Sequence, residues 1–316
     1  MATEYSATFT DVQGGENSTL EWGDFEGPGF DGFSQMPTLD FREACVAIGY
    51  KGDDGRFHVC GSGTMIALGV ILTATHVLDE TTGGAPLAWA YLPNGRLRLW
   101  GPVRRANYSI TVPSPHPTEP DQVETHDISL IACELISPPE VEFPIRIARA
   151  SVAVPSIGAR LWAMGHRRVN PVEQETPDVA LFASSGLVTL VYPDRRDKML
   201  PNPCVEAEMT TIGGMSGGPV YDERGHVVGV VSTSVQGISD EATRPTFVSM
   251  MWPAFLLDVG VGWPAHRWDS FAAQLMTTLV HAPKRGLSNI RGHAGRTPEG
   301  RLYYVVPDDP LPEASA

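Results

Sequence analysis

The sequence predicts an all-β protein. The chain has 316 residues, of which 32 are glycine, 27 are proline and 42% are hydrophobic. This composition suits many short strands joined by tight turns, and it allows a sizeable core. Apolar runs of strand length recur along the chain at turn-length spacing. Helical spacing of apolar residues is found only near the C-terminus, so a fold of alternating strands and helices is not expected.

The expected strands fall into two sets. In the first half of the chain they are 45–50, 57–60, 64–68, 70–73, 88–92, 97–103 and 128–135. In the second half they are 160–164, 179–191, 204–210, 219–221, 227–232 and 246–250. The proline-rich stretch 137–144 separates the two sets and is the expected crossover. Near the C-terminus, 268–279 predicts a closing helix and 302–306 a late strand.

The segment around Ser216 has the composition of a reactive turn. Ser216 lies in Gly213-Gly214-Met215-Ser216-Gly217-Gly218-Pro219. Small residues let a serine hydroxyl lie on a tight, open turn while neighbouring backbone N–H groups point at one spot, as a nucleophile with an oxyanion hole requires. Gly-Ser-Gly turns also occur for purely structural reasons, so this segment alone does not decide between the two interpretations.

Two upstream segments add residues of complementary chemistry. His76 follows the expected strand 70–73, and Asp127 opens the expected strand 128–135. Each is ordinary by itself, since a histidine can simply end a strand and an aspartate can belong to a solvated turn. Together with Ser216, however, they supply the general base, the orienting carboxylate and the nucleophile of a hydrolytic triad. The remaining histidines, His58, His116, His126, His166 and His226 among them, are expected at the surface or in turns.

These segments carry a resemblance to a known family. The order His, Asp, Ser and the phrases T-A-T-H, D-I-S-L and G-M-S-G-G-P resemble the trypsin-like serine proteases of the chymotrypsin fold, in particular their bacterial, intracellular members. The resemblance covers approximately residues 44–253. It implies two antiparallel six-stranded β-barrels, with the active site between them and a C-terminal helix after them.

The resemblance also implies a role for each site residue. Ser216 would be the nucleophile, His76 the general base and acid, and Asp127 the carboxylate that holds the imidazole. The backbone N–H groups of Gly214 and Ser216 would form the oxyanion hole. The implied activity is that of a serine endopeptidase acting on protein or peptide substrates through an acyl-enzyme.

The resemblance, aligned at the serine, also implies a set of substrate-binding residues. Thr210 would lie at the base of the primary pocket with Thr211 beside it, and Ser232, Thr233 and Ser234 would lie along one wall. None of them is acidic, so a preference for a neutral side chain is expected rather than for lysine or arginine.

The resemblance divides the chain into three parts. Residues 1–41 form an acidic, glycine-rich leader, 42–260 the protease domain, and 261–316 a helix and tail. Barrel one would span about 42–136 and barrel two about 145–255. Met215 stands where the family has the aspartate that receives a new amino terminus. Regulation by a partner protein or by the leader is therefore expected instead.

Charge and cysteine usage exclude several partners. The formal net charge of −14 argues against nucleic acid and against an anionic membrane surface as partners. Cys45, Cys60, Cys133 and Cys204 show no disulfide pattern and no zinc spacing, so free thiols, no metal and no cofactor are expected. The opening residues lack the basic start and apolar run of a secretory signal, which favours a cytoplasmic enzyme.

Two other classes of function compete with this interpretation. The spacing G-x-S-x-G also fits the nucleophile elbow of α/β-hydrolases, but that fold needs a helix directly after the serine, and 219–231 predicts a β-hairpin. A protease-like domain kept as a latent binding or sensor module is the second alternative. Met215 supports it, because an altered oxyanion loop could leave the site inactive.

Overall fold

The computed structural model describes the main strands of the chain and part of its ends. The described residues are 9–11, 22–23, 36–37, 44–67, 69–92, 96–112, 114, 116, 118–120, 122–137, 145–168, 179–198, 200–234, 245–256, 290–291, 293–296 and 302–305. The expected helix over 268–279, the stretch 138–144 of the expected crossover and most of the leader lie outside them.

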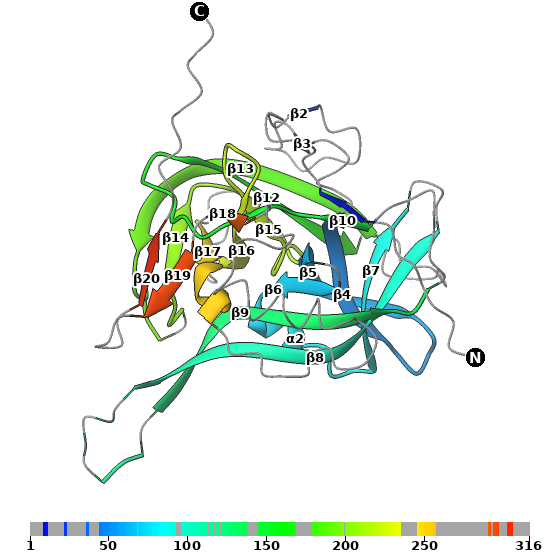
Figure 1. The fold of residues 1–316 in the computed structure, drawn as a ribbon. Coiled ribbons are helices and arrows are strands. Elements are labelled where there is room, and N and C mark those ends of the chain that lie inside the picture. Colours follow the sequence, from blue (N-terminus) through cyan, green and yellow to red (C-terminus); the bar gives the residue numbers. More distant parts are fainter. Residues whose placement is uncertain are drawn as a thin grey trace, which may run out of the picture.

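The first half of the chain forms a closed barrel of six antiparallel strands (Figure 1). Around the barrel the order is β4-β5-β6-β9-β8-β7. The strands are β4 (Cys45–Lys51), β5 (Phe57–Ala67), β6 (Val70–Thr73), β7 (Ala85–Tyr91), β8 (Leu97–Val112) and β9 (Gln122–Leu135). All four residues of β6 are buried, because this strand lies between β5 and β9. The prediction of a six-stranded barrel is confirmed for this half.

The second half forms another ring of strands. The order β15-β12-β13-β14-β17-β16 is closed by an additional pairing between β15 and β16. The strands are β12 (Arg160–Arg168), β13 (Val179–Tyr192), β14 (Cys204–Ala207), β15 (Pro219–Tyr221), β16 (Val227–Ser234) and β17 (Thr246–Met250). Two short strands, β11 (Ala150–Ser151) and β18 (Ile290–Arg291), extend this sheet in parallel beyond β16.

The remaining elements are short. β1 (Phe9–Asp11) pairs in parallel with β10 (Ile145–Ile147), β2 (Trp22–Gly23) pairs with β3 (Met36–Pro37), and β19 (His293–Arg296) pairs with β20 (Leu302–Val305). The helical elements among the described residues are α2 (Thr75–Asp79) and the 3₁₀ helix η2 (Trp252–Leu256). β20 confirms the expected late strand.

Most strands lie where the sequence predicts them, but several are longer. The two strands expected at 57–60 and 64–68 are one continuous strand, β5. β8 and β9 begin or end far beyond the predicted limits, and together they form a long hairpin that projects from the barrel (Figure 1). Val123, in the part of β9 beyond the predicted limit, is 68% exposed, so this part of the hairpin lies outside the core that the apolar pattern marked.

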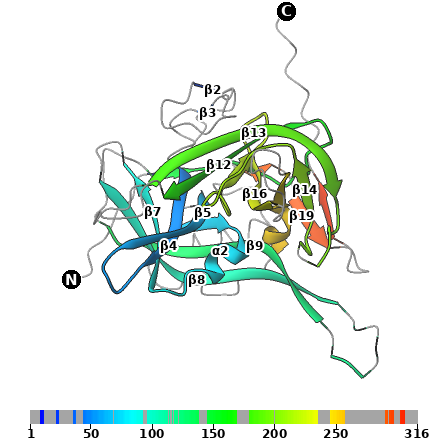
Figure 2. The ribbon, with the colours of Figure 1, turned by 180° about the vertical axis from the view of Figure 1, so that it is seen from behind.

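The two rings share one continuous core. Ile71 and Leu130 of the first barrel and Val205 and Val230 of the second belong to the same cluster of buried apolar residues. Figure 2 shows the strands of both rings side by side from the rear. Backbone hydrogen bonds also join the two halves, as from the Ala148 N–H to the Met65 carbonyl at 2.8 Å. The interface between the two rings, called the seam below, is therefore rigidly packed.

A β-hairpin, not a helix, follows Ser216. β15 and β16 pair through the turn 222–225, in which the Gly225 N–H donates to the Asp222 carbonyl at 2.9 Å and Gly225 has a φ of +75°. An α/β-hydrolase elbow requires a helix at this place. The structure therefore excludes that alternative.

Several expected absences can be examined only in the described part of the chain. There, no helix is long and apolar enough to cross a membrane. The described residues contain no group of three or more His, Cys, Asp or Glu side chains placed to hold a metal ion. All four cysteines are described, and none forms a disulfide. Burial raises the pKa of Cys60 to about 11 and that of Cys204 to about 12, so both are thiols at neutral pH.

Candidate active site

His76 lies at the start of a short helix. β6 ends at Thr73, Ala74 is extended, and α2 begins at Thr75. The Thr75 hydroxyl is hydrogen-bonded to the His126 carbonyl at 2.7 Å and to the Ser129 hydroxyl at 2.8 Å, both in β9. These bonds tie the beginning of α2 to β9, and so they fix His76 relative to Asp127. The sequence predicts His76 at the end of a strand. In the structure, His76 lies in α2, the short helix that follows β6.

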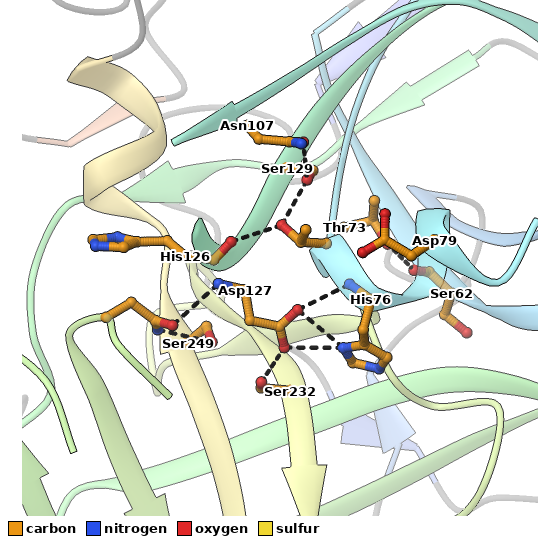
Figure 3. Close-up of polar contacts among 12 residues, drawn as sticks. Ser62, Thr73, His76, Asp79, Asn107, His126, Asp127, Ser129, Ser232 and Ser249 are labelled. Carbon is orange, nitrogen blue, oxygen red and sulfur yellow. Dashed lines mark hydrogen bonds and ion pairs between the residues drawn. The ribbon is translucent and has the colours of Figure 1, made fainter. Parts of the chain in front are cut away.

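Asp127 binds His76 through both of its oxygens (Figure 3). His76 Nδ1 lies 2.9 Å from Oδ1 and 3.0 Å from Oδ2, and the His76 backbone N–H donates to Oδ1 at 3.1 Å. Ser232 of β16 donates its hydroxyl to Oδ2. An ionised carboxylate only accepts hydrogen bonds, so the imidazole hydrogen is on Nδ1 and the neutral ring keeps its lone pair on Nε2.

Asp127 is also held from the second ring through its backbone. Its N–H donates to Oδ1 of the buried Asn202 at 3.1 Å. The Asn202 amide donates in turn to the Ser249 hydroxyl at 3.0 Å and to the Pro203 carbonyl at 3.1 Å. A buried asparagine with three bonded partners has a fixed orientation. Asn202 therefore fixes the position of Asp127 between the two rings, and no motif around Asn202 predicts this role.

The electrostatics of the pair favour charge on Asp127. Burial would raise the pKa of Asp127, but the hydrogen bonds and charge of His76 and the bond from Ser232 outweigh it and hold that pKa below 3.8. Burial would lower the pKa of His76, but Asp127, Glu80 and Asp79 outweigh it and hold that pKa above 6.5. The Asp127 side chain is 13% exposed and that of His76 is 38% exposed. The pair is thus closed on the carboxylate side and open on the imidazole side.

Ser216 lies in the second of two consecutive β-turns. The Met215 N–H donates to the Ile212 carbonyl at 3.0 Å, and the Gly218 N–H donates to the Met215 carbonyl at 2.9 Å. The third residues of the two turns are Gly214, with a φ of +96°, and Gly217, with a φ of +78°. A positive φ at this position is typical of type II turns and favours glycine. The glycine spacing in the sequence is therefore a requirement of the turn geometry.

The backbone of Ser216 lies against the segment that carries His76. The Ser62 N–H donates to the Ser216 carbonyl at 2.7 Å. A Cβ added at Gly61 would lie 2.6 Å both from the Ser216 carbonyl oxygen and from a methyl group of Val77. A Cβ at Gly217 would collide with the Thr73 hydroxyl. Thr73 and Val77 flank His76, so the fold brings His76, Asp127 and Ser216 to one place.

The buried side chain of Met215 anchors the turn to the core. Its side chain is 0% exposed and belongs to the shared core. It packs so closely on β12 that a Cβ added at Gly165 would lie 2.5 Å from the Met215 Cα. Burial in the apolar core therefore holds Met215, the residue before Ser216. The family that the sequence resembles has an aspartate at this position.

The predicted pocket residues have different surroundings. Thr210 is partly buried, and Thr211 shares a hydrogen bond of 2.9 Å with the Thr246 hydroxyl of β17. The Ser232 side chain, predicted in the pocket wall, is bonded to Asp127 instead. Thr233 and Ser234 pair with β17 through their backbones, and the structure does not describe their side chains.

Two histidines expected at the surface are buried. His126 is 2% exposed and His166 is 7% exposed. Burial lowers the pKa of each to about 4, and for His166 a bond to the Cys45 carbonyl partly opposes the effect. Both are neutral at physiological pH. The prediction failed because a single polar residue in a strand carries no sign of which face the fold will cover.

A family model described as a trypsin-like peptidase domain matches residues 61–230, more than half of the chain. The chain is similar to the active form of the Rv3671c protease from M. tuberculosis, with 17% identity and a TM-score of 0.42 over 66% of this chain and 77% of that one. It is also similar to the apo MamO protease domain from Magnetospirillum magneticum, with 16% identity and a TM-score of 0.44 over 67% and 93% of the two chains. No curated protein matches it.

Proposed function

The chain belongs to the family of trypsin-like peptidase domains, and from this premise we propose that it is a serine endopeptidase that hydrolyses peptide bonds of protein substrates. The observation that carries the proposal is the pairing of His76 with Asp127 beside the backbone of Ser216. A base oriented by a carboxylate and placed next to a serine is the arrangement that activates a hydroxyl for acyl transfer.

His76 moves the proton in each step of the proposed mechanism. The Ser216 hydroxyl oxygen attacks the peptide carbonyl carbon while its proton passes to Nε2 of His76. That proton then goes to the leaving amine as the C–N bond breaks, and an acyl group remains on Ser216. A water molecule gives a proton to Nε2 and attacks the acyl group. The acid product leaves as the serine regains its hydrogen.

Asp127 and the turn stabilise the charges that form. Asp127 accepts the hydrogen bond from the Nδ1–H of His76, which keeps Nε2 free as the base and stabilises the imidazolium that forms during the attack. The N–H groups of Gly214 and Ser216 are the proposed donors to the oxyanion. The positive φ of Gly214 and the burial of Met215 support a formed turn and speak against the alternative of a latent binding or sensor module.

Specificity and control are also part of the proposal. We expect a neutral residue on the acyl side of the cleaved bond, with Thr210 and Thr211 near the pocket. Buried, apolar Met215 offers no carboxylate for a new amino terminus, which supports control by a partner protein or by the leader 1–41. The four free thiols support a cytoplasmic location in a bacterial cell.

Labelling by a fluorophosphonate probe tests the proposed function. The wild type is expected to take up one adduct by intact mass, while Ser216→Ala and His76→Ala take up none. Ser109→Ala serves as the control, because it removes an exposed hydroxyl that is bonded to Thr125 at 2.9 Å, and it should label like the wild type. An unlabelled wild type, or labelling that survives in Ser216→Ala, would refute the proposal.

A further inference from the structure

Ser62 makes an unusual set of contacts at the seam between the rings. It lies in β5 with its side chain 0% exposed. Its hydroxyl donates to the Gly214 carbonyl at 2.8 Å and accepts from the His166 N–H at 2.7 Å. Its backbone N–H donates to the Ser216 carbonyl at 2.7 Å. We infer that Ser62 is a positioning residue, which holds Ser216 and its amide in the geometry that the proposed hydrolysis needs.

The direction of the hydroxyl bonds is fixed by chemistry. A backbone N–H can only donate, so the Ser62 oxygen must be the acceptor of the bond from His166. A serine hydroxyl has a single hydrogen, which is therefore left for the Gly214 carbonyl. β12 thus orients the Ser62 hydroxyl toward the turn. Ser62 is itself 0% exposed and the bond is partly buried, which makes its loss costly.

Ser62 restrains the peptide groups on both sides of the reactive one. Its hydroxyl holds the Gly214–Met215 peptide, and its N–H holds the Ser216–Gly217 peptide. Between them lies the Met215–Ser216 peptide, which carries the proposed oxyanion donor of Ser216. With both flanks fixed, the donor and the serine Cα cannot shift independently of β5. The side chain of Ser62 is one of these two restraints, and it can be removed by mutation.

Ser62 also connects the turn to the segment that carries the base. Its carbonyl accepts a hydrogen bond of 2.6 Å from the hydroxyl of Thr73, three residues before His76 (Figure 3). Ser216 belongs to the second half of the chain and His76 to the first, so their separation depends on contacts across the seam. Ser62 touches both sides. Positional errors of about 1 Å in such a site cost on the order of a hundredfold in rate.

Three proteins test this role, which rests on the proposed function. They are the wild type, Ser62→Ala, and Thr64→Val as a matched control. Thr64 is two residues away in the same strand, is equally buried and donates its hydroxyl to the Ala44 carbonyl at 3.2 Å, away from the turn. For each protein we would measure the second-order rate constant of fluorophosphonate labelling and the deuterium uptake of the segment 209–218.

In Ser62→Ala, labelling should slow by about tenfold or more, since losing an oxyanion donor altogether costs roughly 10²–10³. Deuterium uptake in 209–218 should become about tenfold faster or more, because the turn loses its hydrogen bond to Ser62. Thr64→Val should match the wild type in both measurements. The pH midpoint of labelling should not move in Ser62→Ala, because the bonds between His76 and Asp127 remain.

The inference is overturned if Ser62→Ala matches Thr64→Val in both labelling and uptake. The two proposals can fail separately. An unlabelled wild type refutes the hydrolase, and deuterium uptake still decides whether Ser62 holds the turn. If Ser62→Ala does not fold, Ser62→Cys replaces it. A thiol is a weaker donor in the same position, so smaller changes in the same directions are expected and unchanged values overturn the inference.

Discussion

Replacing Met215 by aspartate should destabilise the protein severely. Met215 is 0% exposed and belongs to the shared core. Removing a buried methionine side chain costs roughly 2–5 kcal/mol. Placing an unpaired carboxylate there adds several kcal/mol, of the size of the 3–5 kcal/mol lost when a buried ion pair is broken. The total of about 5 kcal/mol or more is comparable to the whole stability of many domains, about 5–15 kcal/mol.

The penalty should depend on pH with a definite sign. A buried carboxyl without a cation has a folded-state pKa above its unfolded value of about 3.9. The part of the penalty that comes from this shift is present only where the unfolded carboxyl is ionised, so the penalty grows as pH rises above about 4 and levels off above the folded pKa. Urea unfolding of Met215→Asp should show a larger loss at pH 7 than at pH 4, each measured against the wild type.

Two further variants isolate the charge. Met215→Asn has the same shape as the aspartate variant without the charge, so its loss should be smaller and independent of pH. Met215→Leu conserves volume and should cost less than about 1.5 kcal/mol. Equal stability of Met215→Asp and Met215→Asn at pH 7 would refute the reasoning, because it would mean that a cation reaches the position beneath Ser216.

Three other changes have definite expected outcomes. Glu80 helps to raise the pKa of His76, so Glu80→Gln should lower that pKa. Because His76 must be neutral to act as the base, the acid limb of the pH profile of labelling should then shift to lower pH by about a few tenths of a unit. An unmoved limb in low salt contradicts this. Asn202→Ala should cost about 1–3 kcal/mol in urea unfolding, because it leaves the partly buried Asp127 N–H without its acceptor. An unchanged midpoint would show that another acceptor replaces it. Gly217→Ala should abolish labelling, since a side chain at a φ of +78° is strained and its Cβ would collide with barrel one; normal labelling would mean that the turn has another shape.

The strands and the reactive turn were predictable because local chemistry determines them. β6, β15 and β17 begin and end at the predicted residues, since their apolar runs are bounded by turns. The turn at Ser216 needs glycine at two positions of positive φ, and that requirement is visible as a spacing. The order of His76, Asp127 and Ser216 predicted a triad; the structure pairs His76 with Asp127 and places the Ser216 backbone beside the segment that carries His76.

The direction of the Ser232 side chain could not be predicted from strand periodicity. The register between β16 and β17 shifts between Val231 and Thr233, so Ser232 lies at an irregularity of the pairing. Such an irregularity re-aims a side chain, and strict alternation cannot foresee it. Ser232 therefore binds Asp127, although the family resemblance had implied a place in the pocket wall.

By itself, the sequence determined the all-β class, the strand cores and the three residues proposed for chemistry, because each depends on residues within a few positions of one another. Only the tertiary structure decided what holds those three residues in place. Ser62 reaches Gly214 across 152 positions and Asn202 reaches Asp127 across 75. Such bonds form only because the two rings pack on one core. The residues next to a serine or an asparagine in the sequence do not show which distant group it will bind once it is buried.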